Sequence, residues 1–212
     1  HRTYARQTHG RTGDTWFVVI ATIIGAVVVA ASVMLEAVFP VSSSEFSRPL
    51  TLIIDGPSGA GKTWLASYVS AHWRPSRSLV VLHMDDLYRG WTGLSDATNF
   101  LETVVAPARA NREEFRWQRF DWEKNELAEW NTVPADADLI IEGCGSLTRK
   151  TAQIAGLSVW INADDVRRKA WALSRGGENF EHHWHEWDAH FQQFRETHTP
   201  ERYASLVLRS TR

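Results

Sequence analysis

The sequence predicts a three-layer α/β fold with a five-stranded parallel sheet and a helical lid, preceded by a transmembrane helix. Three observations lead to this prediction. Short apolar runs alternate with helical stretches after residue 48, and a glycine-rich loop joins the first run to the first helical stretch. An uncharged apolar segment at residues 16–35 stands apart from this pattern, nearer the start of the chain.

The composition is that of a globular protein. The chain has 212 residues, of which 43% are hydrophobic and 23% charged, so it can bury a full core. The formal net charge is -2, which gives no electrostatic reason to expect a duplex nucleic acid as partner. Cys144 is the one cysteine, so no intrachain disulfide can form.

The first part of the chain divides into three segments. Residues 1–15 form a polar flank, residues 16–38 are predicted to form the transmembrane helix, and residues 39–48 form a linker. The apolar segment would span roughly 30 Å as a helix, about the thickness of a bilayer core. A buried helix, or two strands broken at Gly25, is the alternative interpretation.

Residues 49–212 are predicted to form one domain in which strands and helices alternate. Five short apolar runs have the length and β-branched content of buried parallel strands, at residues 50–54, 79–84, 139–141, 157–161 and 206–208. Four helical stretches separate them, at residues 62–73, 96–110, 164–175 and 180–197. This alternation indicates an open sheet that is covered by helices on both faces.

The loop after the first predicted strand is a complete phosphate-binding motif. Residues 56–63 read G-P-S-G-A-G-K-T and match the P-loop pattern G-x-x-x-x-G-K-[ST], with a strand before and a helix after. The backbone amides of such a loop bind phosphates, Lys62 reaches the β- and γ-phosphates, and the Thr63 hydroxyl can bind Mg²⁺. We therefore expect ATP with Mg²⁺ as ligand. The predicted nucleotide-binding residues are Gly56, Ser58, Gly59, Ala60, Gly61, Lys62 and Thr63.

Carboxylates follow two further predicted strands. Asp85 and Asp86 come directly after the run at residues 79–84, and Glu142 follows the run at residues 139–141. Ligands of open α/β sheets bind at the carboxyl ends of strands, so Asp85 is a candidate general base or Mg²⁺ organiser, and Glu142 a candidate Mg²⁺ organiser. The alternatives are a pair of surface-loop aspartates and a glutamate that caps a turn.

Residues 49–212 resemble the uridine kinase/phosphoribulokinase family of P-loop kinases. Besides the P-loop, the segments D-D-L-Y at 85–88, F-D-W at 120–122, I-E-G at 141–143 and R-Y-A-S-L-V at 202–207 are similar to family elements in order and spacing. The resemblance implies that Asp85 lies at the acceptor hydroxyl. It also implies an acceptor site formed by Asp86, Tyr88, Phe120, Asp121 and Trp122. Departures are present too, since E-K-N at 123–125 replaces the family's His and Arg.

The resemblance also implies lid arginines over the transferred phosphate. Arg168 and Arg175 lie seven residues apart on a predicted helix, and Gly176-Gly177 follows as a candidate hinge. The alternative is a solvated basic helix end.

Two side-chain patterns have a simpler interpretation than a site. Four aromatic residues recur at helical spacing in residues 180–197, which favours packing against the core over metal binding by the histidines between them. A basic stripe is expected on an exposed face if the segment around residues 109–119 is helical. The first set is Trp184, Trp187, Phe191 and Phe194, and the second is Arg109, Arg112, Arg116 and Arg119.

Taken together, the sequence predicts ATP-dependent phosphoryl transfer to a hydroxyl of a small molecule, with Lys62, Asp85, Arg168 and Arg175 as the catalytic residues. The second hypothesis is a membrane-anchored regulatory module that binds ATP or GTP without efficient transfer. The arginines of the flank 1–15 would keep that flank in the cytoplasm by the positive-inside rule, whereas an ATP enzyme needs its catalytic domain there. We expect a cytoplasmic kinase domain anchored to the membrane by one helix.

Overall fold

The structure is a computed structural model that describes residues 48–73 and 77–210, with the backbone alone for residues 176–179. The predicted transmembrane helix at residues 16–38 and the flank before it lie outside the described residues. Among the helices of the described ranges, none has the length and apolar character needed to cross a bilayer.

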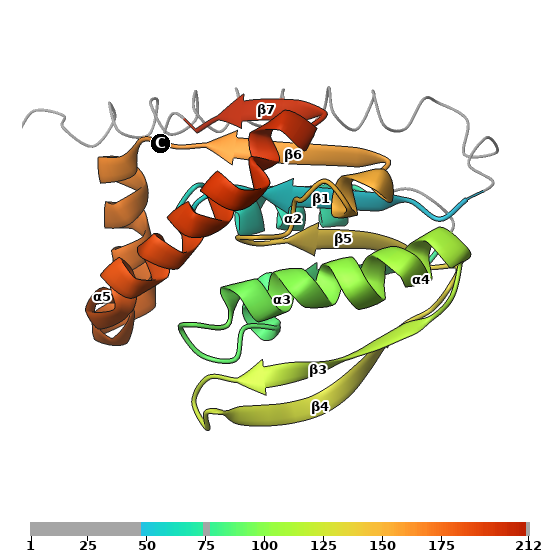
Figure 1. The fold of residues 1–212 in the computed structure, drawn as a ribbon, viewed down its shortest axis with the longest axis horizontal. Helices are drawn as coiled ribbons and strands as arrows, with labels where there is room; N and C mark the ends of the chain where they lie inside the picture. The colour runs from blue at the N-terminus through green and yellow to red at the C-terminus, as the bar shows by residue number, and fades with distance from the viewer. Residues whose placement is uncertain (1–47, 74–76, 211–212) are drawn as a thin grey trace, which may run out of the picture.

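A five-stranded parallel sheet forms the centre of the domain, as predicted (Figure 1). The strand order is β2-β5-β1-β6-β7. Each strand coincides with one of the five predicted apolar runs within two residues. The strands are β1 (Thr51–Asp55), β2 (Leu79–His83), β5 (Asp138–Glu142), β6 (Leu157–Asn162) and β7 (Leu206–Arg209).

The register of the central strands brings their carboxyl ends together. Ile54 of β1 and His83 of β2 both pair with Glu142 of β5. Every residue of β1 and β5 is buried, which explains why their sequences are nearly continuous apolar runs rather than alternating ones. The P-loop, the residues after β2 and the residues after β5 therefore begin at one edge of the sheet.

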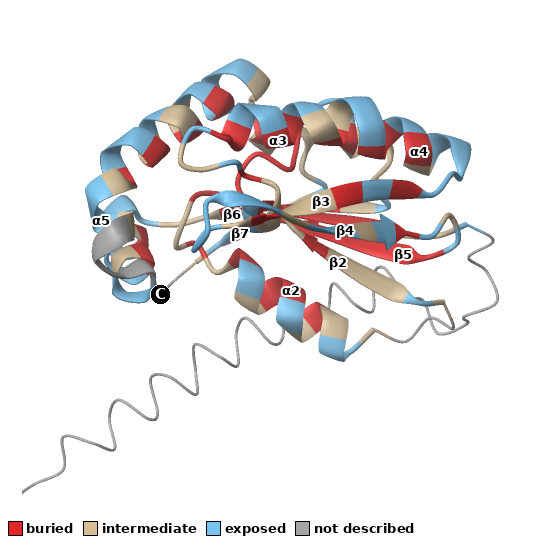
Figure 2. Cartoon of the chain, turned by 90° about the horizontal axis from the view of Figure 1, so that it is seen from below, coloured by how far each residue is buried: buried red, intermediate tan, exposed pale blue. Residues whose placement is uncertain are grey.

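Helices cover both faces of the sheet, which makes the predicted three layers (Figure 2). Helix α2 (Lys62–Ala71) lies on one face. On the other face, α3 (Leu94–Phe100), a π-helical turn (Leu101–Val105) and α4 (Ala106–Asn111) follow one another directly. Three short 3-10 turns complete this part of the fold: Met84–Asp86, Thr151–Gln153 and Pro200–Tyr203.

An antiparallel hairpin of β3 (Phe115–Asp121) and β4 (Glu126–Val133) projects beside the main sheet, and the sequence analysis did not predict it. The condition for the basic stripe, a helix through residues 109–119, is not met. Helix α4 ends at Arg112, which adopts a left-handed conformation with φ 58°. Arg116 and Arg119 then lie on β3.

Helix α5 (Asp165–His198) replaces the two separate helices that were predicted, and it folds back on itself. Arg168 donates a hydrogen bond of 2.9 Å to Asp188, 20 residues further on. A straight helix would separate two such residues by about 30 Å, so α5 has two arms that meet between Arg175 and Phe180, around the predicted hinge (Figure 1). The predicted apolar stripe of the second arm is confirmed: Trp184, Trp187, Phe191 and Phe194 are all buried.

Candidate active site

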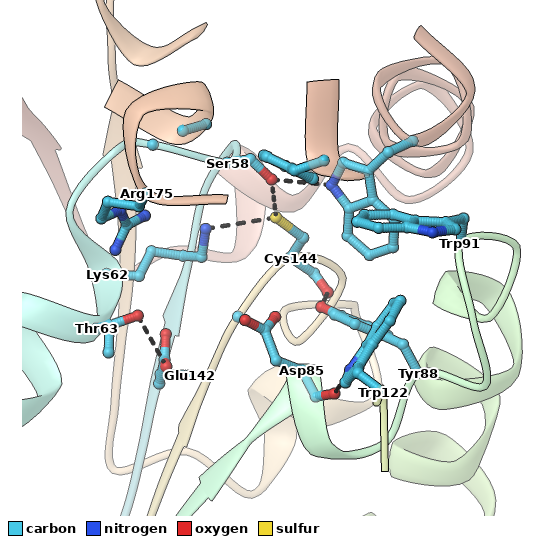
Figure 3. A pocket seen from close by; sticks show the side chains of 15 residues that line it. Ser58, Lys62, Thr63, Asp85, Tyr88, Trp91, Trp122, Glu142, Cys144 and Arg175 are labelled. Atoms are coloured by element: carbon cyan, nitrogen blue, oxygen red, sulfur yellow. Dashed lines mark hydrogen bonds between the residues drawn. The ribbon is translucent and has the colours of Figure 1, made fainter. Parts of the chain in front are cut away.

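A cavity of about 460 Å³ opens where the carboxyl ends of the central strands meet. Its walls come from the P-loop, the residues after β2 and β5, the turn of the hairpin and both arms of α5. Figure 3 shows the labelled side chains, with Lys62 and Thr63 on one side and Trp91 and Trp122 on the other.

The P-loop has a backbone path that requires glycine. Gly56 has φ 144° and Gly59 has φ 80°, and both values lie in the region that L side chains rarely adopt. A Cβ atom on Gly56 would lie 2.5 Å from the Ile161 carbonyl oxygen, and one on Gly59 would lie 2.0 Å from that of Arg168. The loop is therefore held directly against β6 and against the first arm of α5.

Lys62 begins α2 and is buried with its amine in the cavity wall. Its Nζ donates to the Pro57 carbonyl oxygen at 3.0 Å and to Cys144 Sγ at 3.4 Å. Burial lowers the pKa of Lys62, but the nearby acidic groups, Cys144 and Glu142 first among them, outweigh burial and raise it. The amine is therefore charged and available to an anion.

Thr63 and Glu142 form the candidate Mg²⁺ site. Thr63 Oγ1 donates to Glu142 Oε1 at 3.1 Å, and the same oxygen lies 2.7 Å from Nδ1 of His83. The hydrogen bond to Glu142 is the main cause of the raised pKa of His83. Hydroxyl and carboxylate oxygens suit Mg²⁺, which binds proteins through one or two carboxylates and takes its other ligands from phosphates and water. The described side chains form no cluster of three or more His, Cys, Asp or Glu that could enclose a metal ion.

Asp85 lies on the cavity wall, whereas Asp86 does not. The backbone carbonyl of Asp85 accepts a hydrogen bond of 2.9 Å from the indole N–H of Trp122, which fixes the hairpin turn against this residue. The surrounding protein desolvates the Asp85 carboxyl and, together with the negative charge of Glu142, raises its pKa. A carboxylate with a raised pKa accepts a proton more readily near neutral pH.

The residues predicted to bind the acceptor divide into two groups. Tyr88 and Trp122 line the cavity, whereas Asp86, Phe120 and Asp121 do not. Phe120 is buried and packs edge-on against Trp122. Asp121 accepts the backbone N–H groups of Glu123 and Lys124, each at 3.1 Å, so its carboxylate closes the hairpin turn.

The two predicted lid arginines also differ in where their side chains lie. Arg175 lines the cavity and lies beside Lys62 in Figure 3. Arg168 is 4% exposed and donates to Asp165 and Asp188 at 2.7 and 2.9 Å, which ties together the two arms of α5. Arg168 lines a second cavity of about 260 Å³, and its Nη1 has no hydrogen-bond partner among the described residues.

Several residues of the site were not predicted. Trp187 of α5 donates its indole N–H to Ser58 Oγ at 2.8 Å, and Ser58 Oγ lies 3.4 Å from Cys144 Sγ. Trp91 contributes to the same wall. Only Cys144 had a usable sequence signal, because it comes two residues after Glu142 at the end of a predicted strand.

Asp55, the last residue of β1, was also missed. It is fully buried, and its carboxylate accepts the backbone N–H of Gly56 at 2.6 Å, of Gly145 at 3.1 Å and of Leu147 at 2.8 Å. It therefore joins the P-loop to the loop after β5. Desolvation outweighs these hydrogen bonds and raises the pKa of Asp55 to about 7.

Asp55 is expected to make the free energy of unfolding depend on pH. Between about pH 4 and 7 the folded state keeps a proton on Asp55 that the unfolded state has released. The contribution of Asp55 to the free energy of unfolding should thus fall by up to about 4 kcal/mol as pH rises through this window. Asp55→Asn should remove this dependence of the free energy of unfolding on pH. Urea unfolding from pH 4.5 to 8 measures it, with Asp96→Asn, an exposed aspartate on α3, as control. Parallel pH profiles for wild type and Asp55→Asn would contradict the prediction.

The fold and the loop define a P-loop α/β domain. No protein-family model matches the chain, and no curated protein matches its sequence. Among solved structures, a possible uridine kinase from Bacillus stearothermophilus has the same fold, with a TM-score of 0.60 and 20% sequence identity over 84% of this chain and 96% of that one. A D-glycerate 3-kinase from Cryptococcus neoformans var. grubii serotype A gives a TM-score of 0.45 and 15% identity, over 90% of this chain and 89% of that one. The resemblance inferred from the motifs is therefore confirmed at the level of the fold.

Proposed function

We propose that this protein is an ATP-dependent kinase that phosphorylates a hydroxyl group of a small molecule, in the manner of uridine kinases. The observation that carries the proposal is the convergence of Lys62, the Thr63–Glu142 pair and Asp85 on one cavity. A phosphate-binding group, an oxygen pair suited to Mg²⁺ and a carboxylate with a raised pKa are the parts that phosphoryl transfer needs.

The phosphates of ATP would lie along the backbone amides of the P-loop, with Lys62 at the β- and γ-phosphates. Thr63 and Glu142 would hold Mg²⁺, Glu142 being oriented by His83. When bound, Mg²⁺ neutralises charge that develops on the phosphate oxygens. The second cavity shares Pro57 with the P-loop and is lined by Asn162 and by Arg209 at the end of β7, which supports it as the site of the ATP nucleoside.

Asp85 would act as the general base. The acceptor oxygen attacks the γ-phosphorus, the bond from that phosphorus to the β–γ bridging oxygen breaks, and ADP leaves. The proton of the acceptor hydroxyl passes to the Asp85 carboxylate. Arg175, on the first arm of α5, would stabilise the charge on the transferred group. Arg168, on the same arm, holds the two arms together through Asp188 of the second arm.

Acceptor-dependent release of ADP from Mg-ATP tests the proposal. The purified full chain would be assayed with a panel of nucleosides, sugars and hydroxy acids, and the phosphorylated product identified by mass spectrometry. A kinase releases ADP in proportion to product for at least one acceptor. Nucleotide binding with slow hydrolysis that no acceptor accelerates would instead support a regulatory module.

A further inference from the structure

The half of the cavity opposite the P-loop is aromatic. Trp91 lies at its centre, with its ring centroid 4.9 Å from that of Trp122 and 5.4 Å from that of Phe180. The wall joins three segments that are distant in sequence: the loop after β2, the hairpin turn and the second arm of α5. We call it the aromatic wall, and its members are Tyr88, Trp91, Trp122, Phe180 and Trp187.

Most polar atoms of the aromatic wall are already bonded within the protein. The Tyr88 hydroxyl donates to the Cys144 carbonyl oxygen at 2.6 Å. The Trp122 indole N–H donates to the Asp85 carbonyl oxygen and that of Trp187 donates to Ser58 Oγ. These residues therefore offer few hydrogen bonds to a ligand. Tyr88 and Trp187 are 1% and 5% exposed, so the ring surface open to a ligand belongs mainly to Trp91, Trp122 and Phe180.

The charged groups of the cavity lie elsewhere. Apart from Asp85, all described lining residues from these three segments are aromatic. Lys62, Thr63 and Glu142 belong to the phosphate side, and Arg175 lies next to Lys62 and away from Trp91 (Figure 3). Among the described lining residues, the acceptor half thus has one carboxylate for the reacting hydroxyl and no further charged side chain to pair with an acceptor.

We infer that the acceptor is a neutral alcohol carried on a planar ring, bound by stacking on the aromatic wall and not through additional hydroxyl groups. The inference rests on the proposed function for the role of Asp85. A sugar, polyol or hydroxy acid would bury hydroxyls or a carboxylate without partners, which is unfavourable. A planar ring loses little by leaving water and gains contact with the indole faces.

Two ligands that differ only in their sugar hydroxyls give the sharpest test. Uridine and 2′,3′-dideoxyuridine share the ring and the 5′-hydroxyl. A site that reads hydroxyls rejects the analogue that lacks them by about 10⁴-fold or more. Stacking without hydroxyl recognition predicts that the kcat/KM of dideoxyuridine equals or exceeds that of uridine, since the ring contact is the same in both and the 2′- and 3′-hydroxyls of uridine find no partner. A preference for uridine above tenfold, or a preference for glycerol, D-glycerate or choline over both, would overturn the inference.

Binding to the full chain separates this inference from the kinase proposal. With Mg²⁺ and a non-hydrolysable ATP analogue present, dideoxyuridine and benzyl alcohol should bind more tightly than glycerol, as measured by saturation-transfer NMR and calorimetry. Ring alcohols that bind without being phosphorylated would refute kinase activity and leave the inference standing. Ring alcohols that bind no better than glycerol would overturn it, whatever the turnover.

Substitution of one wall residue gives the matched comparison. Trp122 is 36% exposed and lies on the hairpin turn, so Trp122→Ala should fold. Loss of one stacking ring should weaken dideoxyuridine binding by about 5- to 100-fold. Trp130→Ala, on the same hairpin but outside the cavity and 57% exposed, should leave binding unchanged. Equal effects of the two substitutions would contradict the inference.

Discussion

Replacing Lys62 with alanine is expected to lower Mg-ATP-dependent turnover by about 10²- to 10⁴-fold. The amine is held in the cavity wall by the Pro57 carbonyl and the Cys144 thiol, so its position is set before any ligand arrives. Such a preorganised charge loses little by reorganisation when negative charge develops on the phosphates. Steady-state release of ADP measures the effect on turnover, and calorimetric titration with Mg-ATP measures the effect on ATP affinity.

Thermal unfolding and one control substitution distinguish loss of the Lys62 amine from a general loss of structure. Removal of the amine leaves buried acceptors without a donor, which costs about 1–3 kcal/mol, so thermal unfolding must show that Lys62→Ala is still folded. Lys124→Ala removes a lysine from the exposed hairpin turn and should behave as wild type. Unchanged ATP affinity together with unchanged turnover in Lys62→Ala would refute the P-loop assignment.

The parts of the molecule that the sequence predicted correctly depend on short stretches of chain. The strands β1 and β5 are buried along their whole length, and the central residues of each, 52–54 and 139–141, form an uninterrupted apolar run. The P-loop is likewise local, because its glycines and Lys62 function within eight consecutive residues, 56–63. A phosphate-binding loop could therefore be proposed before the fold was known.

The hairpin was missed because its pattern is mixed. Phe115 and Trp117 of β3 are buried, and the exposed Arg116 lies between them, which is the alternation of a strand. The arginines at 109, 112, 116 and 119 recur at spacings of three and four, which is also the period of a helix face. The alternation of a strand and the spacing of a helix thus overlap in one segment. The helix ends before the strand because Arg112 is left-handed, and nothing in the sequence marks that residue.

The aromatic wall could not be predicted because it depends on the path of α5. Trp187 reaches Ser58, 129 residues away in sequence, because α5 folds back after Arg175. Asp121 shows the reverse case: the family pattern implied an acceptor contact, but its carboxylate has nearer donors in its own turn. Spacing along the chain does not indicate which of two available partners a side chain takes.

Asp85→Asn is expected to reduce turnover by about 10²- to 10⁴-fold while Mg-ATP binding survives. The substitution keeps the size of the side chain and removes the group that would accept the acceptor's proton. Its backbone carbonyl still accepts the Trp122 N–H, so the hairpin turn should stay in place. Asp86→Asn is the matched control, because Asp86 is the next residue on the same turn and does not line the cavity.

The dependence of the remaining activity on Mg²⁺ separates the two roles considered for Asp85. If Asp85 is the general base, Asp85→Asn lowers kcat and leaves the Mg²⁺ concentration for half-maximal rate unchanged, because the proposed metal site of Thr63 and Glu142 is left intact. If Asp85 organises Mg²⁺, that concentration rises and excess Mg²⁺ restores part of the rate. We expect the first result. A loss of no more than twofold in Asp85→Asn, with a large loss in Asp86→Asn, would transfer the role to Asp86 and show that the carboxylate outside the cavity wall reaches the acceptor when ligands are bound.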